Sequence, residues 1–127
     1  MKSEVLPEVD VALVGEMLLG KWKDIRLATR KICEKPEMWQ IPGLSHHEHR
    51  ERVLGQLKVL VQEGATSYGF PKVVGGNADP GGSLTVFEEL VLADPSLQIK
   101  YGVQWGLFGA AILYLGTDDH HKDLLPT

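Results

Sequence analysis

The longest stretch without a charged residue lies between Tyr101 and Leu115, where every residue is apolar, small or glutamine. Its flanks carry helix boundary signals: Asp94 is a good N-cap, and Pro95 suits the first helical position, where its missing N–H costs nothing. Gly116 is placed to end the helix. Because a helix that is apolar on all sides belongs in an interior, we expect this one at the centre of the fold.

Small residues repeat along one side of this predicted helix, since Gly102, Gly106 and Ala110 are four positions apart. Gly109 is a further interior glycine, and each interior glycine costs about 1 kcal/mol relative to alanine. Two features can offset that cost: close approach of a neighbouring helix, or room for a ligand. Larger apolar side chains cover the other sides: Ile99, Val103 and Leu107 in one row, and Leu97, Tyr101, Trp105, Phe108 and Ile112 around it.

Apolar periodicity and capping residues predict further helices over residues 11–19, 21–34 and 46–63, from Ser83 to Asp94, and from Thr117 onward. Asp10 caps the first of them, and Ser45 with Glu48 forms a capping box for the third. The third helix has one apolar face, made of Val53, Leu54, Leu57, Leu60 and Val61, and the helix after Ser83 is expected to point Val86, Phe87, Leu90 and Val91 inward. No strand-like alternation appears. The predicted fold is all-α, an orthogonal bundle of about six helices.

Residues 64–82 are rich in glycine and proline and predict one long structured loop. Phe70 and its apolar neighbours suggest that the loop packs onto the domain, and long loops in compact domains are often functional. The Gly75-Gly76 pair fits neither the P-loop nor the dinucleotide-binding pattern.

Composition narrows the classes of function. The chain has 127 residues, 43% hydrophobic and 24% charged, with a net charge of −4, so we expect a single domain over 1–127 and no basic nucleic-acid footprint. The uncharged stretch rises only about 22 Å as a helix, against about 30 Å of bilayer core, so no membrane span is expected. Cys33 is the single cysteine, which excludes an internal disulfide. The first seven residues show no secretory signal, and the last three match no peroxisomal tripeptide.

Candidate chemistry is sparse. The histidines fall into two groups, His46-His47-His49 and His120-His121, and neither has further ligands at metal-binding spacing. Glu88-Glu89 offers paired carboxylates, but we interpret them as charges near the positive end of a helix that starts at Ser83. We therefore predict no metal and no catalytic residue.

The second half of the chain resembles the amino-terminal helical domain of the acyl-CoA dehydrogenase and acyl-CoA oxidase superfamily. The order and spacing of its motifs fit together over about 60 residues, which is more specific than any single motif. The motifs are Gly69-Phe70-Pro71, Gly75-Gly76, Phe87-Glu88-Glu89-Leu90, Asp94-Pro95-Ser96-Leu97, Leu115-Gly116-Thr117 and Leu124-Leu125-Pro126. Lys100-Tyr101-Gly102-Val103-Gln104, Gly106-Leu107-Phe108-Gly109 and His120-His121 favour the oxidase branch.

This resemblance implies an FAD-dependent enzyme that converts fatty acyl-CoA to trans-2-enoyl-CoA in β-oxidation. A glutamate removes the α-proton and the flavin takes the β-hydride; an oxidase then reduces oxygen, whereas a dehydrogenase uses an electron-transfer protein. In this family the glutamate and most of the flavin site lie in the middle and carboxy-terminal domains. We expect those domains to be missing from residues 1–127, which would make this piece inactive alone.

The resemblance also implies a role for the central helix, because the family's first domain forms part of the wall around the acyl tail. The expected wall residues are Ile99, Val103, Leu107, Gly102 and Gly106. Expected partners are fatty acyl-CoA, the rest of the same polypeptide and further copies of it, in the cytoplasm or, in a eukaryote, the peroxisome. The alternative of another class is a non-catalytic helical interaction module.

Overall fold

All regular structure in the computed structural model, which describes residues 8–125, is helical. The helices are α1 (Val11–Leu19), α2 (Lys23–Cys33), η1 (Pro36–Met38), α3 (His46–Gln62), η2 (Lys72–Val74), α4 (Pro80–Ala93), α5 (Pro95–Tyr101), η3 (Gly102–Gly109), α6 (Ala110–Leu115) and α7 (Asp118–Leu124). The predicted all-α architecture is confirmed within these residues. Residues 1–7, where no secretory signal was expected, and 126–127 lie outside the described part.

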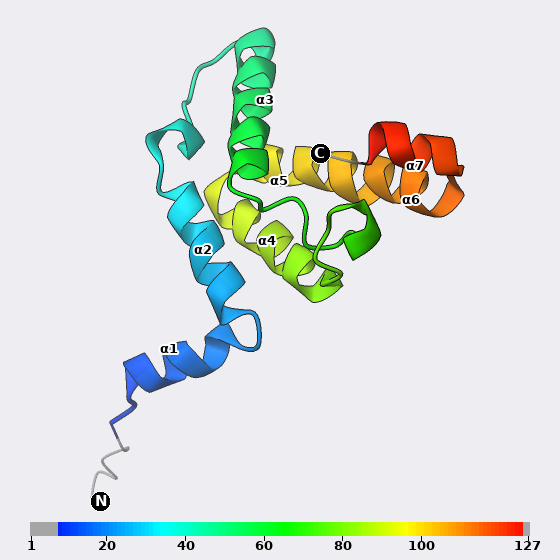
Figure 1. Cartoon of the computed structure of the whole chain (residues 1–127). Coiled ribbons are helices and arrows are strands. Elements are labelled where there is room, and N and C mark those ends of the chain that lie inside the picture. Colours follow the sequence, from blue (N-terminus) through cyan, green and yellow to red (C-terminus); the bar gives the residue numbers. More distant parts are fainter. Residues whose placement is uncertain (1–7, 126–127) are drawn as a thin grey trace, which may run out of the picture.

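The helices cross one another rather than running in parallel (Figure 1). Helix α4 packs against α2 on one side and α5 on the other, and α3 stands across α5. From α5 through η3 to α6 the chain forms one continuous rod, and α7 folds back beside α6. The core lies where α2, α3, α4 and α5 meet, and its fully buried members include Leu60, Val86, Leu90 and Leu97.

Most predicted helix starts are confirmed, because local capping residues decide them. The side chains of Asp10, Asp94 and Thr117 each accept a backbone N–H at the start of a helix. Ser45 and Glu48 form the predicted capping box of α3. The apolar face of α3 is narrower than expected, since Val53, Leu57 and Leu60 are buried whereas Leu54 and Val61 face outward.

The predicted start of α4 at Ser83 was wrong, and the loop is correspondingly shorter than residues 64–82. Asp79 caps the helix by accepting from the N–H of Gly82, and Pro80 occupies the first helical turn. Gly81 therefore lies inside the helix, where a β-carbon would come 1.9 Å from the Trp22 ring. Gly81 and Gly82 leave room on the backbone of α4 for α2 and its N-terminal tryptophan, which pack directly against it.

The shorter loop still forms a structured unit, as predicted. Backbone hydrogen bonds join its two limbs, with the N–H groups of Asn77, Ala78 and Asp79 donating to the carbonyls of Ser67, Phe70 and Tyr68. A β-carbon at Gly76 would lie 2.1 Å from the carbonyl oxygen of Phe70. Only glycine allows the two limbs to approach so closely.

The expectation that Glu88 and Glu89 lie near a helix end was also wrong, since both are in the middle of α4. The Glu89 carboxylate is 1% exposed and pairs with the guanidinium groups of Arg26 and Arg30 on α2. Burial raises the pKa of Glu89, but hydrogen bonds and charge from Arg30 and Arg26 outweigh it, and the pKa lies below its ordinary value. The ion pairs of Glu89 with Arg26 and Arg30 thus join α4 to α2.

The central rod differs from prediction in two ways. Its middle, η3, is π-helical rather than α-helical, and π-helical stretches are frequent at functional sites. It is also only partly buried: Leu97, Tyr101 and Ile112 face the interior, whereas Ile99, Leu107 and Leu115 are exposed. Its uniformly apolar sequence does not distinguish the side covered by this chain from the side left open.

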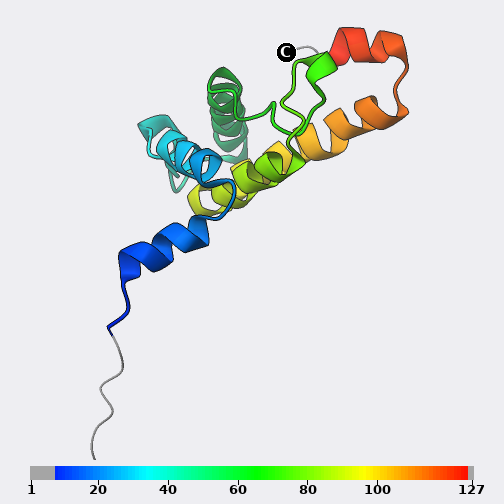
Figure 2. The same ribbon diagram turned by 60° about the horizontal axis from the view of Figure 1, so that its bottom comes forward.

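Helix α1 extends away from the rest of the molecule (Figures 1 and 2). None of its residues is buried, although Val11, Met17 and Leu18 are large and apolar. Val91 of α4, expected to point inward, is also exposed. Within residues 8–125, no helix combines the length and apolar character needed to cross a bilayer.

Candidate functional site

Two hollows flank the π-helical segment η3 and share the side chains of Phe70 and Trp105. The first, which we call the enclosed cavity although it is partly open to solvent, has a volume of about 160 Å³ and lies between η3, the loop that joins α3 to α4, and the end of α7. The second, the glycine groove, has a volume of about 360 Å³ and lies between η3 and the N-terminal half of α4. Phe70 therefore stands between two spaces that open on different sides of one helix.

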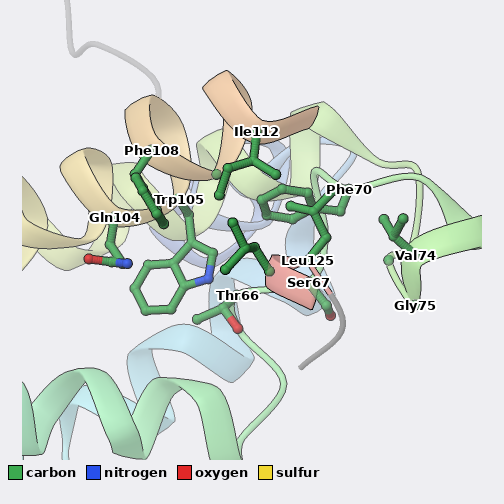
Figure 3. Close-up of a pocket in the computed structure, with 13 residues that line it drawn as sticks. Thr66, Ser67, Phe70, Val74, Gly75, Gln104, Trp105, Phe108, Ile112 and Leu125 are labelled. Atoms are coloured by element: carbon green, nitrogen blue, oxygen red, sulfur yellow. The ribbon is translucent and has the colours of Figure 1, made fainter. Parts of the chain in front are cut away.

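The walls of the enclosed cavity are about equally polar and apolar. Figure 3 shows Trp105, Phe108 and Ile112 projecting from the rod, opposite Thr66 and Ser67 of the loop. The remaining lining residues are Phe70, Val74, Gly75, Gly76, Gln104, Gly109, Leu124 and Leu125.

Helix α7 closes one end of this cavity through Leu124 and Leu125, of which Leu125 is buried. Two neighbouring histidines hold α7 in place. His120 accepts the backbone N–H of Thr117 through Nδ1 at 3.1 Å, in a capping box, and Nε2 of His121 lies 3.0 Å from the carbonyl oxygen of Ile112. Both histidines therefore hold the turn between α6 and α7.

Phe70 is held against the rod because Gly109 has no side chain. A β-carbon at Gly109 would lie 2.7 Å from Cζ of the Phe70 ring. Gly109 is itself buried. This glycine therefore accommodates an aromatic side chain of the loop rather than a neighbouring helix, and it sets the position of the wall between the hollows.

The glycine groove is lined by the small residues Gly102, Gly106 and Ala110, as their four-residue spacing predicts. They play different roles within it. A β-carbon at Gly102 would lie 2.8 Å from the Phe87 ring, whereas one at Gly106 would meet nothing within 4 Å. Gly102 thus accommodates a neighbouring aromatic ring, and Gly106 leaves open space.

The five residues expected to form an acyl-tail wall do not share one surface. Gly102, Gly106 and Leu107 line the glycine groove. Ile99 lines a separate hollow between α3 and α5, and Val103 is part of neither. The residues that line the enclosed cavity, such as Gln104 and Phe108, are not among the five. Trp105, Phe108 and Ile112 appear in the sequence only as large apolar side chains around the helix, a pattern that does not separate core from site.

Ionisable groups near the two hollows do not form a catalytic arrangement in the described residues. Burial raises the pKa of Tyr101, whose hydroxyl donates to the carbonyl of Ala65 at 3.2 Å. The backbone N–H groups of Gly75 and Gly76 already donate to Lys72 and Pro71. Among residues 8–125 there is no cluster of three or more histidine, cysteine or acidic side chains fit to hold a metal ion.

Comparison with known proteins gives two matches. Residues 23–127 match the family described as acyl-CoA dehydrogenase, N-terminal domain. The peroxisomal acyl-coenzyme A oxidase 2 of Arabidopsis thaliana is 34% identical over 86 residues, a stretch that covers 68% of this chain but 12% of that oxidase. No solved structure matches the chain.

Proposed function

This chain belongs to the acyl-CoA dehydrogenase N-terminal domain family, and we propose that it acts as the helical domain of an FAD-dependent enzyme that oxidises fatty acyl-CoA. The family match confirms the resemblance seen in the sequence. The proposal assigns this domain a binding role: it forms part of the wall around the acyl tail and keeps water away from it. The enclosed cavity beside η3 is the observation that carries this role.

The oxidase branch is favoured over the dehydrogenase branch. The relative with 34% identity is named as an oxidase, and the motifs from Lys100 to Gly109 point the same way. We propose that electrons pass from the reduced enzyme to oxygen, producing hydrogen peroxide. If the enzyme is instead a dehydrogenase, acyl-CoA oxidation will require an added electron-transfer protein and will produce no peroxide.

We place the end of the acyl tail in the enclosed cavity. A cavity of about 150 Å³ in another protein holds a benzene ring, so the 160 Å³ here is enough for the last few carbons of an alkyl chain. The walls around that end come from three separate segments, η3 with α6, the loop between α3 and α4, and the end of α7. Such a wall can discriminate chain length, since one methylene in an apolar pocket is worth about 1–3 kcal/mol.

The glycine groove is a second candidate for the tail, because Gly102, Gly106 and Leu107 of the expected wall line it. It is wider and more open than the enclosed cavity, and nearly all its lining is apolar. Together with α1, it presents exposed apolar surface of the kind that other protein surfaces cover. We propose that the rest of the same polypeptide, or a further copy in a homo-oligomer, packs there.

The Gly75-Gly76 pair does not form a phosphate site for a flavin, because its backbone N–H groups already donate inside the loop. We therefore assign no step of the reaction to this chain and propose that other domains of a longer polypeptide hold FAD and the catalytic glutamate. A cytoplasmic or, in a eukaryote, peroxisomal location follows from the same proposal.

The test is photo-crosslinking in the polypeptide that contains this domain together with the flavin-binding domains. A fatty acyl-CoA with a diazirine at the chain end should label Trp105, Phe108 or Leu125, as mapped by mass spectrometry. Labelling of Leu84 or Leu107 instead would place the tail in the glycine groove. Absence of acyl-CoA oxidation in that polypeptide, with intact FAD, would favour the alternative of a non-catalytic interaction module.

A further inference from the structure

A third hollow, which we call the cationic cleft, lies between α3 and α5 and has a volume of about 590 Å³. Its apolar floor is formed by Val53 and Leu54 of α3 and Ile99 of α5. The residues at positions 49, 50, 53 and 54 of α3 share one helix face, as do those at positions 96, 99 and 100 of α5. Helices α3 and α5 are in contact, and Figure 1 shows α3 standing across α5.

Positive charge surrounds this floor. Arg50 and Lys100, one from each helix, line the cleft together with His49, and Glu51 is the single acidic residue lining it. Neither Arg50 nor Lys100 forms an ion pair with any of residues 8–125. In a chain with a net charge of −4, this local excess of positive charge favours an anionic ligand.

We propose that the cationic cleft binds a medium- or long-chain fatty carboxylate. The carboxylate lies between Arg50 and Lys100, and the alkyl chain covers Leu54 and Ile99, which are 45% and 63% exposed without it. The volume of the cleft falls in the range of small-molecule sites, about 300–1,000 Å³. Positive side chains from two different helices beside one apolar floor favour a single amphipathic anion.

This proposal does not depend on the proposed function, because the cleft shares no lining residue with the enclosed cavity or the glycine groove. It gives the domain a second lipid site that carries no reacting group. A free fatty carboxylate at this site lies on a different side of the rod from the acyl-CoA tail.

The experiment is a titration of the ¹⁵N-labelled chain with decanoate below its micelle-forming concentration, followed by NMR. Amide shifts should concentrate at residues 49–54 and 96–100. Affinity should rise about three- to fourfold per added methylene until the floor is covered. Decanol, with the same chain length and no charge, should bind more weakly, and added salt should weaken decanoate only.

Variants locate the site. Arg50→Gln and Lys100→Gln should each weaken decanoate binding about two- to fivefold, whereas Lys58→Gln, on α3 but outside the cleft, should leave it unchanged. Leu54→Glu places a carboxylate on the exposed floor and should abolish binding. Equal affinity for decanol and decanoate, or shifts centred on Phe70 and Trp105, would overturn the proposal. Binding of an acidic amphipathic peptide but not decanoate would overturn it as well, and would assign a protein partner.

Discussion

The indole N–H of Trp22 donates to both carboxylate oxygens of Asp79, each at 3.0 Å, although the two residues are 57 positions apart. Asp79 is also the N-cap of α4. One carboxylate therefore starts α4 and fixes the beginning of α2 against it. The packing of the Trp22 ring on Gly81 completes the contact.

Replacing Asp79 should therefore destabilise the whole fold rather than one helix end. Asp79→Ala removes a cap and the acceptor of the indole, and we expect a loss of about 2–4 kcal/mol in the free energy of unfolding. Trp22→Phe keeps an aromatic ring on Gly81 and should cost about 1–2 kcal/mol. Urea titration followed by circular dichroism measures both.

Asp10→Ala is the matched control, since Asp10 caps α1 through the same type of hydrogen bond. Because α1 buries no residue, loss of its cap should change global stability by less than about 0.5 kcal/mol. Similar losses for Asp10→Ala and Asp79→Ala would contradict the role we give to the contact with Trp22.

The pairing of Glu89 predicts how stability depends on pH. Its pKa is lower in the folded chain, so the unfolded chain binds the proton more readily. The stabilisation is present above the unfolded pKa, about 4.3, and is lost as pH falls through the lower folded value. Glu89→Gln should cost about 3 kcal/mol at pH 7, and the variant and the wild-type protein should converge in acid.

Glu88→Gln is the control for this pH series. Glu88 pairs with Arg26 but is 65% exposed, so its loss should cost less than about 1 kcal/mol. Urea midpoints measured between pH 3 and pH 7 distinguish the two variants. A Glu89→Gln variant whose stability follows the wild-type curve in parallel would show that Glu89 is not the group that titrates.

Two glycines should respond in opposite ways to alanine. At Gly106 the added β-carbon meets nothing within 4 Å, and the helical backbone should gain up to about 1 kcal/mol. At Gly76 the β-carbon would lie 2.1 Å from the Phe70 carbonyl oxygen, so the loop must shift and we expect a loss above about 2 kcal/mol. Thermal unfolding of both variants provides the comparison.

Gly109→Ala should alter chain-length preference in the polypeptide that carries the flavin-binding domains. The β-carbon displaces the Phe70 ring and changes the volume of the enclosed cavity. We expect kcat/KM for long acyl chains to fall about tenfold, with short chains little affected. Gly106→Leu fills only the glycine groove and serves as the comparison. A larger long-chain effect from Gly106→Leu would place the tail in that groove.

Residues 1–127 alone should not bind flavin. The backbone N–H groups of Gly75 and Gly76 already donate within the loop and are not available to a pyrophosphate, so a titration with FAD should show no quenching of flavin fluorescence at micromolar protein. The purified chain should be colourless. A stoichiometric yellow complex would contradict the assignment of the flavin to other domains.

Capping residues, which act on their immediate neighbours in the sequence, explain most of the helix starts that could be predicted. Asp-Pro at residues 94–95 correctly marked a helix start, and the same pair at 79–80 marked the start of α4. The second signal is hidden in the sequence because Gly81-Gly82 has the composition of a loop, and only the contacts with Trp22 and Ile25 of the neighbouring chain segment explain those glycines. Which side of the rod is exposed, and the burial of Glu89, depend on neighbours that are distant in sequence and do not appear in helical periodicity.

The π-helical turns of η3 set the rotation of everything after them. One residue added or removed between Tyr101 and Ala110 would turn α6 by about 100° around the rod axis. Ile112 would leave the enclosed cavity, and α7 would swing away with Leu125. The length of this segment should therefore be less tolerant of change than the identity of its outward-facing side chains.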